Sequence, residues 1–126
     1  MKNYKLFTAA KVGSLALKNH MVMAPMTRCR AIDNIPNELM ATYYQQRASA
    51  GIIITEGTSP SPNGLGYARI TGIFSLTQIK KKKKTTEAVH KSGGKIVVQL
   101  MHTGRISHAL NMPNGSKIIA PSAIKA

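Results

Sequence analysis

Three short apolar runs, each followed at once by polar or turn-forming residues, constrain the fold of this chain more than any other feature. The second and third runs are rich in β-branched residues, which is typical of strands buried on both faces of a parallel sheet. Proline cannot donate to a sheet ladder, so Pro25 marks the end of the first run. The runs are His20–Met23, Ile52–Ile54 and Ile96–Val98, and they lead into Ala24–Arg28, Thr55–Gly57 and Gln99–Leu100.

Two helices are expected between the runs. Start signals at Pro36 and Asn37 and a one-sided apolar pattern predict a helix that closes before Gly51. A second helix is predicted over Thr77–Ser92, with Gly93–Gly94 as its stop. The apolar positions expected on its face are Ile79, Ala88 and Val89.

The resulting order is β-α-β-α-β, which indicates an α/β fold with parallel strands joined by right-handed crossovers. The other segments are expected to be irregular or short. They are a hairpin or extended entry over residues 6–19, a polar loop over Thr27–Asn37, a long loop over Thr58–Ser75 and a loop-like segment over residues 101–126.

Polar residues just past successive strand ends are what a (β/α)8 barrel uses to build a site on one face. Such a barrel needs about 250 residues, and this chain has 126. The chain is therefore too short to form a whole barrel of this type.

The formal net charge is +14, and Lys80–Lys84 form an unbroken basic run. Such a balance is compatible with an anionic or nucleic-acid partner. The other lysines are scattered, however, and the six aromatic residues do not interleave with the basic ones. We therefore expect no nucleic-acid partner. The run itself has three interpretations: a solvated helix face, a locally weakened helix, or an anion-binding segment.

Other features exclude several classes of protein. Cys29 is the single cysteine, which fits a reducing compartment, and the N-terminus lacks the apolar region of a secretory signal. No apolar run approaches the roughly 20 residues that span a membrane. His102 and His108 have no acidic or thiol partner nearby, so no metal site is expected. The chain is predicted to be cytoplasmic, without a membrane partner.

The strand-end residues offer groups suited to a flat ligand. The Thr27 hydroxyl donates and accepts, and the Gln99 amide can pair with an imide edge. Gly57 permits a close approach of the backbone, while Pro25 and Met26 supply an apolar wall. Together they suit a planar heterocycle with alternating carbonyl and N–H groups. Taken singly, Thr27 is better explained as a cap and Gln99 as a partner of buried loop backbone, whereas their joint placement at the ends of three strands favours a ligand.

At these residues the chain resembles the Old Yellow Enzyme family of flavin-dependent ene-reductases. The similarity runs from about Leu6 to the end in one register, which makes the set of motifs far more specific than any one of them. The matching stretches are Val22–Arg28, Tyr43–Ala48, Ile54–Gly57, Gly64–Tyr67, Val98–Arg105 and Ala120–Ala123.

The resemblance implies the (β/α)8 TIM-barrel type, here only its first βαβαβ portion, with residues 1–126 as a truncated, N-terminal part of one domain and no second domain. It also implies non-covalent FMN in that barrel, which reduces activated C=C bonds of a small-molecule substrate with NADPH or NADH. It implies that Pro25 and Met26 contact the flavin ring, that Thr27 bonds flavin O4, and that Gln99 pairs with the pyrimidine edge. Gly57 is expected near flavin N5. Tyr67 and Met101 are expected at the substrate pocket, and Met101 stands where many relatives have tryptophan.

By the same resemblance, the substrate-binding pair, the proton donor and the phosphate-binding loops lie on later strands. No catalytic residue is therefore expected within this chain. Two alternatives to an enzyme portion stay open. The chain is otherwise an incomplete barrel without activity, whose open strand edges favour self-association, or a basic anion- or nucleic-acid-binding protein.

Overall fold

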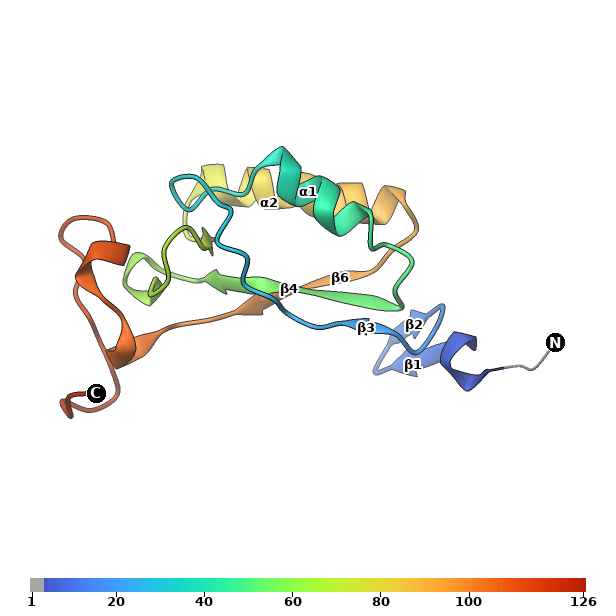
Figure 1. Ribbon diagram of the computed structural model, residues 1–126, viewed down its shortest axis with the longest axis horizontal. Coiled ribbons are helices and arrows are strands. Elements are labelled where there is room, and N and C mark those ends of the chain that lie inside the picture. Colours follow the sequence, from blue (N-terminus) through green and yellow to red (C-terminus); the bar gives the residue numbers. More distant parts are fainter. Residues whose placement is uncertain (1–3) are drawn as a thin grey trace.

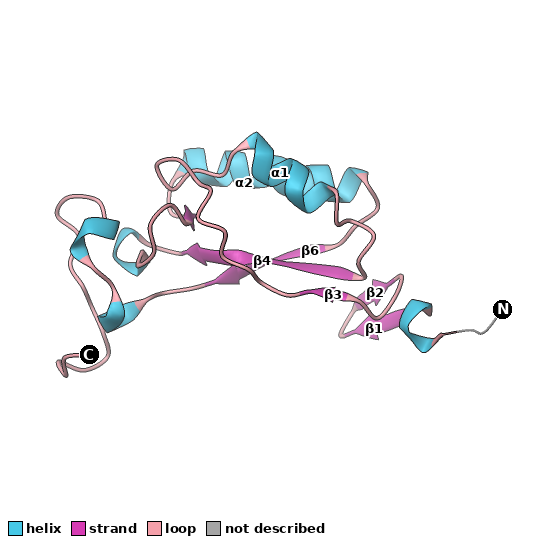
Figure 2. Ribbon diagram, in the orientation of Figure 1, coloured by secondary structure: helices cyan, strands magenta, loops and turns pink. Residues whose placement is uncertain are grey.

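The computed structural model describes residues 4–126, in which a four-stranded parallel sheet carries two helices on one of its faces (Figures 1 and 2). A separate antiparallel hairpin lies near the N-terminal end. The sheet strands are β3 (Val22–Met23), β4 (Ile52–Ser59), β5 (Thr71–Gly72) and β6 (Ile96–Leu100), and the hairpin strands are β1 (Ala10–Val12) and β2 (Leu15–Leu17).

Strand β4 is the centre of the sheet, and every other strand pairs with it in parallel. Ile53 pairs with Met23 of β3 and with Ile96 of β6, so β3 and β6 lie on opposite edges of β4. Thr58 likewise pairs with both β5 and β6. Strands β3 and β5 therefore share one edge of β4, at its two ends, while β6 follows the other edge.

Local sequence explains where the two helices begin. In α1 (Glu38–Gln45) the Asn37 side chain accepts from the Met40 N–H, at 3.1 Å. In α2 (Leu76–Lys91) Ser75 and Gln78 form a capping box, in which each side chain accepts from the other residue's backbone N–H. These caps satisfy N–H groups that the first turn of a helix leaves without partners.

The core lies between the helix layer and β4. Tyr44 and Ala48 from the α1 region, Ile53 of β4 and Val89 of α2 form one buried cluster. Fully burying an aliphatic side chain such as Ile53 contributes about 1.5–3 kcal/mol, so this small cluster is what holds α1 and α2 on the sheet.

The structure confirms the predicted order of strands and helices and forms the hairpin within residues 6–19. Strand β3 ends at Met23, as Pro25 requires, and α1 and α2 lie within two residues of the predicted starts. The C-terminal segment adds only the short turns η3 (Gly104–Ile106) and η4 (Ala109–Asn111).

Three details of the prediction are wrong. Strand β4 continues to Ser59, and the expected long loop contains β5 and the turn η2 (Pro62–Gly64). Ile79 is exposed, because Gln78, Lys82, Thr85 and Val89 form the buried face of α2. The side chains of β6 are partly or largely exposed, because within residues 4–126 only β4 pairs with this strand.

One further turn, η1 (Lys5–Phe7), precedes the hairpin. No helix in the described part of the chain has both the length and the apolar character needed to cross a membrane.

Candidate functional site

The C-terminal ends of β3, β4 and β6 meet at one end of the sheet. The segment after β3 runs beside β4, and the Arg28 N–H donates to Oε2 of Glu56, at 3.4 Å. Gly57 of β4 pairs with Gln99 of β6, and the Met101 N–H donates to the Thr58 carbonyl, at 3.0 Å. The predicted residues of the three strand ends are thus brought together, as parallel strands require.

The polar side chains among these residues are free to bind. Thr27 is exposed and Gln99 half-buried, and neither side chain makes a hydrogen bond to any residue within 4–126. Met26 is 46% exposed, and Pro25 is half-buried. The Thr27 and Gln99 side chains therefore do not cap or bond any described backbone, and Pro25 and Met26 beside them are partly exposed to solvent.

Gly57 lies on the sheet face that the helices leave bare. Its neighbours Glu56 and Thr58 have their side chains on the helix side, where Lys82 bonds Thr58, and side chains alternate along a strand. A Cβ on Gly57 would lie 2.7 Å from the Met101 Cε. The flexible Met101 side chain thus covers Gly57, and it must rotate before a flat ring can reach this backbone.

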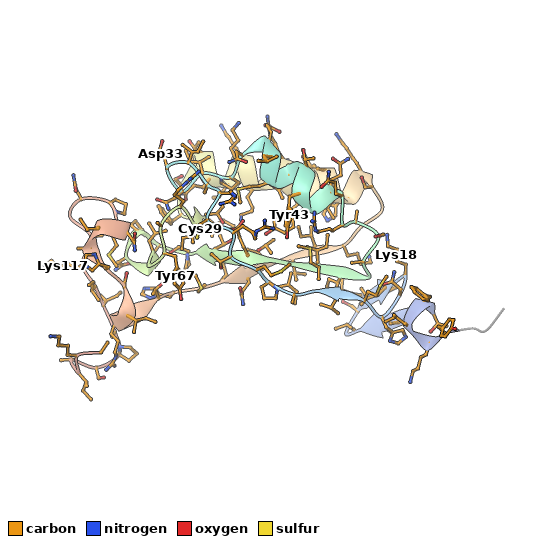
Figure 3. The ribbon with its side chains drawn as sticks, viewed as in Figure 1. Lys18, Cys29, Asp33, Tyr43, Tyr67 and Lys117 are labelled. Atoms are coloured by element: carbon orange, nitrogen blue, oxygen red, sulfur yellow. The ribbon has the colours of Figure 1, made fainter. Side chains whose placement is uncertain are left out.

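Tyr67 lies on the loop after η2, and it is 47% exposed. Figure 3 shows it toward the end of the sheet at which β4 terminates. Its loop is fixed to the segment after β6, since Thr103 Oγ1 donates to the Gly64 carbonyl at 3.2 Å and the Asn111 side chain donates to the Gly66 carbonyl at 3.0 Å. These bonds fix the loop that carries Tyr67 to the segment that follows β6 and begins at Met101.

Glu56 is a buried charged residue that sequence reasoning did not select. It is 2% exposed, and its backbone N–H donates to the Tyr44 hydroxyl at 2.8 Å. Burial raises the pKa of the Glu56 carboxyl, although the Arg28 N–H and the positive charges of Lys82 and Arg28 oppose that rise. The available signal was an ionisable side chain within a run otherwise typical of a buried strand.

Lys82 is the second buried ionisable group behind the strand ends. Its Nζ lies 3.0 Å from the hydroxyls of both Thr58 and Thr71, which themselves lie 3.0 Å apart. Burial lowers the pKa of Lys82 to about 8, and the nearby charge of Glu56 opposes that shift. The basic run is therefore not wholly a solvated face, because its third lysine turns into the protein.

A cavity of about 220 Å³ opens on the helix side of Glu56, between α1 and the segment at Arg28. The Arg28 and Arg47 guanidinium carbons lie 4.9 and 3.8 Å from the centre of the Tyr43 ring. None of the seven predicted cofactor and substrate residues lines this cavity. It is therefore separate from the strand-end surface that carries them.

His102 and His108 each accept a hydrogen bond from a backbone N–H two residues further along the chain. Nδ1 of His102 accepts from the Gly104 N–H at 3.1 Å, and Nδ1 of His108 accepts from the Leu110 N–H at 3.2 Å. Among residues 4–126 no group of three His, Cys, Asp or Glu side chains is arranged to hold a metal ion.

Known proteins share both the sequence and this geometry. Residues 5–125 match the model of the NADH:flavin oxidoreductase / NADH oxidase family. The chain is 42% identical over 120 residues to 12-oxophytodienoate reductase 7 of Oryza sativa subsp. japonica, covering 94% of this chain and 30% of that protein.

Solved structures agree over the same region. Morphinone reductase in complex with tetrahydroNAD superposes with a TM-score of 0.92 at 49% identity, over 98% of this chain and 34% of that one. The old yellow enzyme homologue from Zymomonas mobilis superposes with a TM-score of 0.89 at 45% identity, over 95% and 34%. These neighbours confirm the α/β fold of the (β/α)8 barrel type. The chain spans about a third of the length of these relatives.

Proposed function

Because the chain belongs to the NADH:flavin oxidoreductase / NADH oxidase family, we propose that it forms the part of an FMN-dependent reductase that grips the flavin ring. FMN, when bound, supplies the hydride chemistry, and the protein supplies orientation and electrostatics. The observation that carries the proposal is the meeting of three strand ends with the Thr27 and Gln99 side chains unpaired within the described chain.

Each residue has a distinct part in this proposal. The Gln99 amide donates to a ring carbonyl and accepts from a ring N–H at the pyrimidine edge. The Thr27 hydroxyl would donate to flavin O4, which would orient the ring and contribute to the electrostatics around it. Pro25 and Met26 form the apolar wall, and Gly57 supplies the backbone surface that Met101 now covers.

The donor set fits a flavin in its chemistry. A flavin held without a covalent bond would need an amide partner for its pyrimidine edge, a hydrogen-bond donor for O4 and a glycine where the protein backbone approaches the ring. Gln99, Thr27 and Gly57 would supply these three features. Tyr67 and Met101 are proposed to border the place of a small-molecule substrate with an activated C=C bond. A reductant of the NADH or NADPH type is supported by the relative that binds tetrahydroNAD.

The relatives are about three times as long as this chain, so catalytic turnover is proposed for the family's full-length architecture and not assigned to residues of this chain. The cytoplasm is the proposed compartment, since Cys29 cannot form a disulfide within the chain.

A flavin titration tests the proposal. We expect the chain to quench the fluorescence of riboflavin and of FMN with similar dissociation constants at moderate salt, because the proposed contacts all involve the ring and none involves the phosphate. Gln99→Leu should weaken both by about tenfold, the effect of losing one or two hydrogen bonds.

Gln46→Leu is the matched control, because Gln46 is exposed at the end of α1. If wild type and Gln99→Leu bind flavin with the same dissociation constant, Gln99 does not contact the flavin. A chain that binds neither flavin would contradict the proposed function.

A further inference from the structure

Glu56 occupies a junction of three elements behind the strand ends. Its carboxylate accepts from the Arg28 N–H of the segment after β3, and its backbone N–H donates to Tyr44 of α1. Lys82 of α2 is the third neighbour: its Nζ donates to the Thr58 hydroxyl at 3.0 Å, and that hydroxyl donates to the Glu56 carbonyl at 3.2 Å. The charge of Lys82 acts on the same carboxylate. A side chain that is 2% exposed and faces a segment and two helices has little freedom to move.

The junction lies directly beside residues of the proposed flavin surface. Arg28 follows Thr27 in the chain, and Glu56 precedes Gly57. The Arg28–Glu56 contact is therefore a direct side-chain link between the segment carrying Thr27 and the strand carrying Gly57. The segment is also held by the Arg28 guanidinium, which lies 4.9 Å from the centre of the Tyr43 ring. The Asn37 side chain holds it too, by donating to the Arg30 carbonyl at 2.9 Å, but neither of these contacts reaches β4.

The strength of the bond between the Arg28 N–H and Glu56 depends mainly on the negative charge of the carboxylate. At 3.4 Å the Arg28 N–H lies beyond the usual hydrogen-bond range, but an ionised acceptor strengthens such a bond about twofold. The charged groups that face the carboxylate are Arg28 from the segment and Lys82 from α2, with the neutral hydroxyl of Tyr44 from α1. Both charged neighbours are cations, so both favour the ionised carboxylate.

We propose that Glu56 is a positioning residue, whose carboxylate holds the segment carrying Thr27 against β4, and that Lys82 is the buried cation that keeps this carboxylate ionised. The part that concerns Thr27 and flavin rests on the proposed function. The link between Glu56, Lys82 and the Arg28 amide does not.

The Arg28 backbone amide reports on this link. In the full 126-residue chain, we expect its NMR chemical shift to titrate with a midpoint above the ordinary Glu value of 4.5, the direction in which burial moves this carboxyl. Glu56→Gln keeps an acceptor but removes the charge, so this titration should disappear. Lys82→Met should move the midpoint further upward, whereas Lys83→Met should leave it unchanged, because Lys83 is exposed.

An Arg28 titration that persists in Glu56→Gln, or a midpoint that Lys82→Met leaves in place, would overturn the proposal. If circular dichroism shows that Glu56→Gln does not fold, the comparison of Lys82→Met with Lys83→Met decides alone. A merely structural lysine would not move the midpoint.

Riboflavin binding provides the second readout. We expect Glu56→Gln to weaken it by about tenfold, as for loss of a charge-assisted contact, and Lys83→Met to leave it unchanged. Equal binding by wild type and Glu56→Gln would overturn the link to flavin. If wild type binds no flavin but the Arg28 amide titrates as predicted, the role of Glu56 is supported and only the proposed function is refuted.

Discussion

The Lys82 amine lies between two threonine hydroxyls on the helix side of the sheet. A neutral amine has two N–H donors, and Thr58 and Thr71 supply two acceptors at 3.0 Å. The side chain is 7% exposed, and no carboxylate in the described chain forms an ion pair with it. Burial therefore disfavours the ammonium ion relative to water, which agrees with a pKa lowered to about 8, and below that pKa Lys82 is still the cation beside Glu56.

This burial makes stability depend on pH. The pKa of Lys82 falls from 10.5 when unfolded to about 8 when folded, so between those values the unfolded chain binds more protons. The free energy of unfolding should therefore rise with pH across that window, by about 3 kcal/mol at most. Urea unfolding of wild type at several pH values across the window measures this rise.

Lys82→Met should abolish the rise, because it removes the titrating group while Thr58 and Thr71 still bond each other. Lys83→Met should retain the rise. The same pH dependence in wild type and Lys82→Met would contradict the assignment.

At the scale of elements, the capping box of α2 is the clearest local device. The Ser75 hydroxyl accepts from the Gln78 N–H at 3.2 Å, and the Gln78 side chain accepts from Ser75 and Phe74. Ser75→Ala should lower the free energy of unfolding by about 1 kcal/mol, the usual effect of losing an N-cap. Thermal or urea unfolding measures the loss.

Thr77→Ala is the matched control, because Thr77 is exposed in the same first turn. It should change stability by less than about 0.5 kcal/mol. Equal losses in the two variants would show that the hydroxyl of Ser75 does not cap the helix.

The elements differ in how well sequence could predict them. Ile52–Ile54 is a strand because three β-branched residues fit only a buried pleated surface, and the structure buries two of them in the sheet centre. Strand β5 was not predicted, because it has only two residues, Thr71 and Gly72, which show no apolar pattern and form a strand only by pairing with β4. The run Ile96–Val98 has the same composition as a central strand, but its exposure depends on neighbours that the pattern does not specify.

The site divides in a similar way. Residues at strand ends could be predicted, because parallel strands place their C-terminal ends together whatever the details of packing. Glu56 carries a signal, because it is an ionisable residue in a run typical of a buried strand, but the sequence does not show which cation lies near it. Lys82 could not be predicted, because a lysine in a basic run is expected on the solvated face of its helix, and only the packing of α2 turns it toward β4. The sequence pattern predicts which residues share a face of one helix or strand, whereas the burial of a charged residue depends on how helices and strands pack against each other.

At the scale of the whole molecule, the sheet is covered on one face only (Figures 1 and 2). Both helices lie on that face, and β6 pairs only with β4 among the described strands. Val97, Val98 and Leu100 of β6 are 38%, 42% and 59% exposed. The edge of β6 that faces away from β4 has no partner among the described strands, and such an edge with apolar side chains is a template for pairing with another chain.

The net charge opposes that pairing. With 18 basic and 4 acidic residues, two copies of the chain repel each other. The screening length falls from about 10 Å at 0.1 M salt to about 3 Å at 1 M. We therefore expect self-association to increase with salt, as measured by sedimentation or size-exclusion chromatography, because salt removes the repulsion and leaves the apolar contact.

Leu100→Lys should reduce this association at every salt concentration, because it places a charge on the exposed part of β6. Leu110→Lys is the matched control: Leu110 is 88% exposed, lies outside the sheet in η4, and undergoes the same chemical change with the same added charge. If both variants weaken association equally, the added net charge explains the effect, and β6 is not shown to form the contact. If association instead decreases as salt rises, the contact between copies is ionic, and β6 is not the surface that joins them.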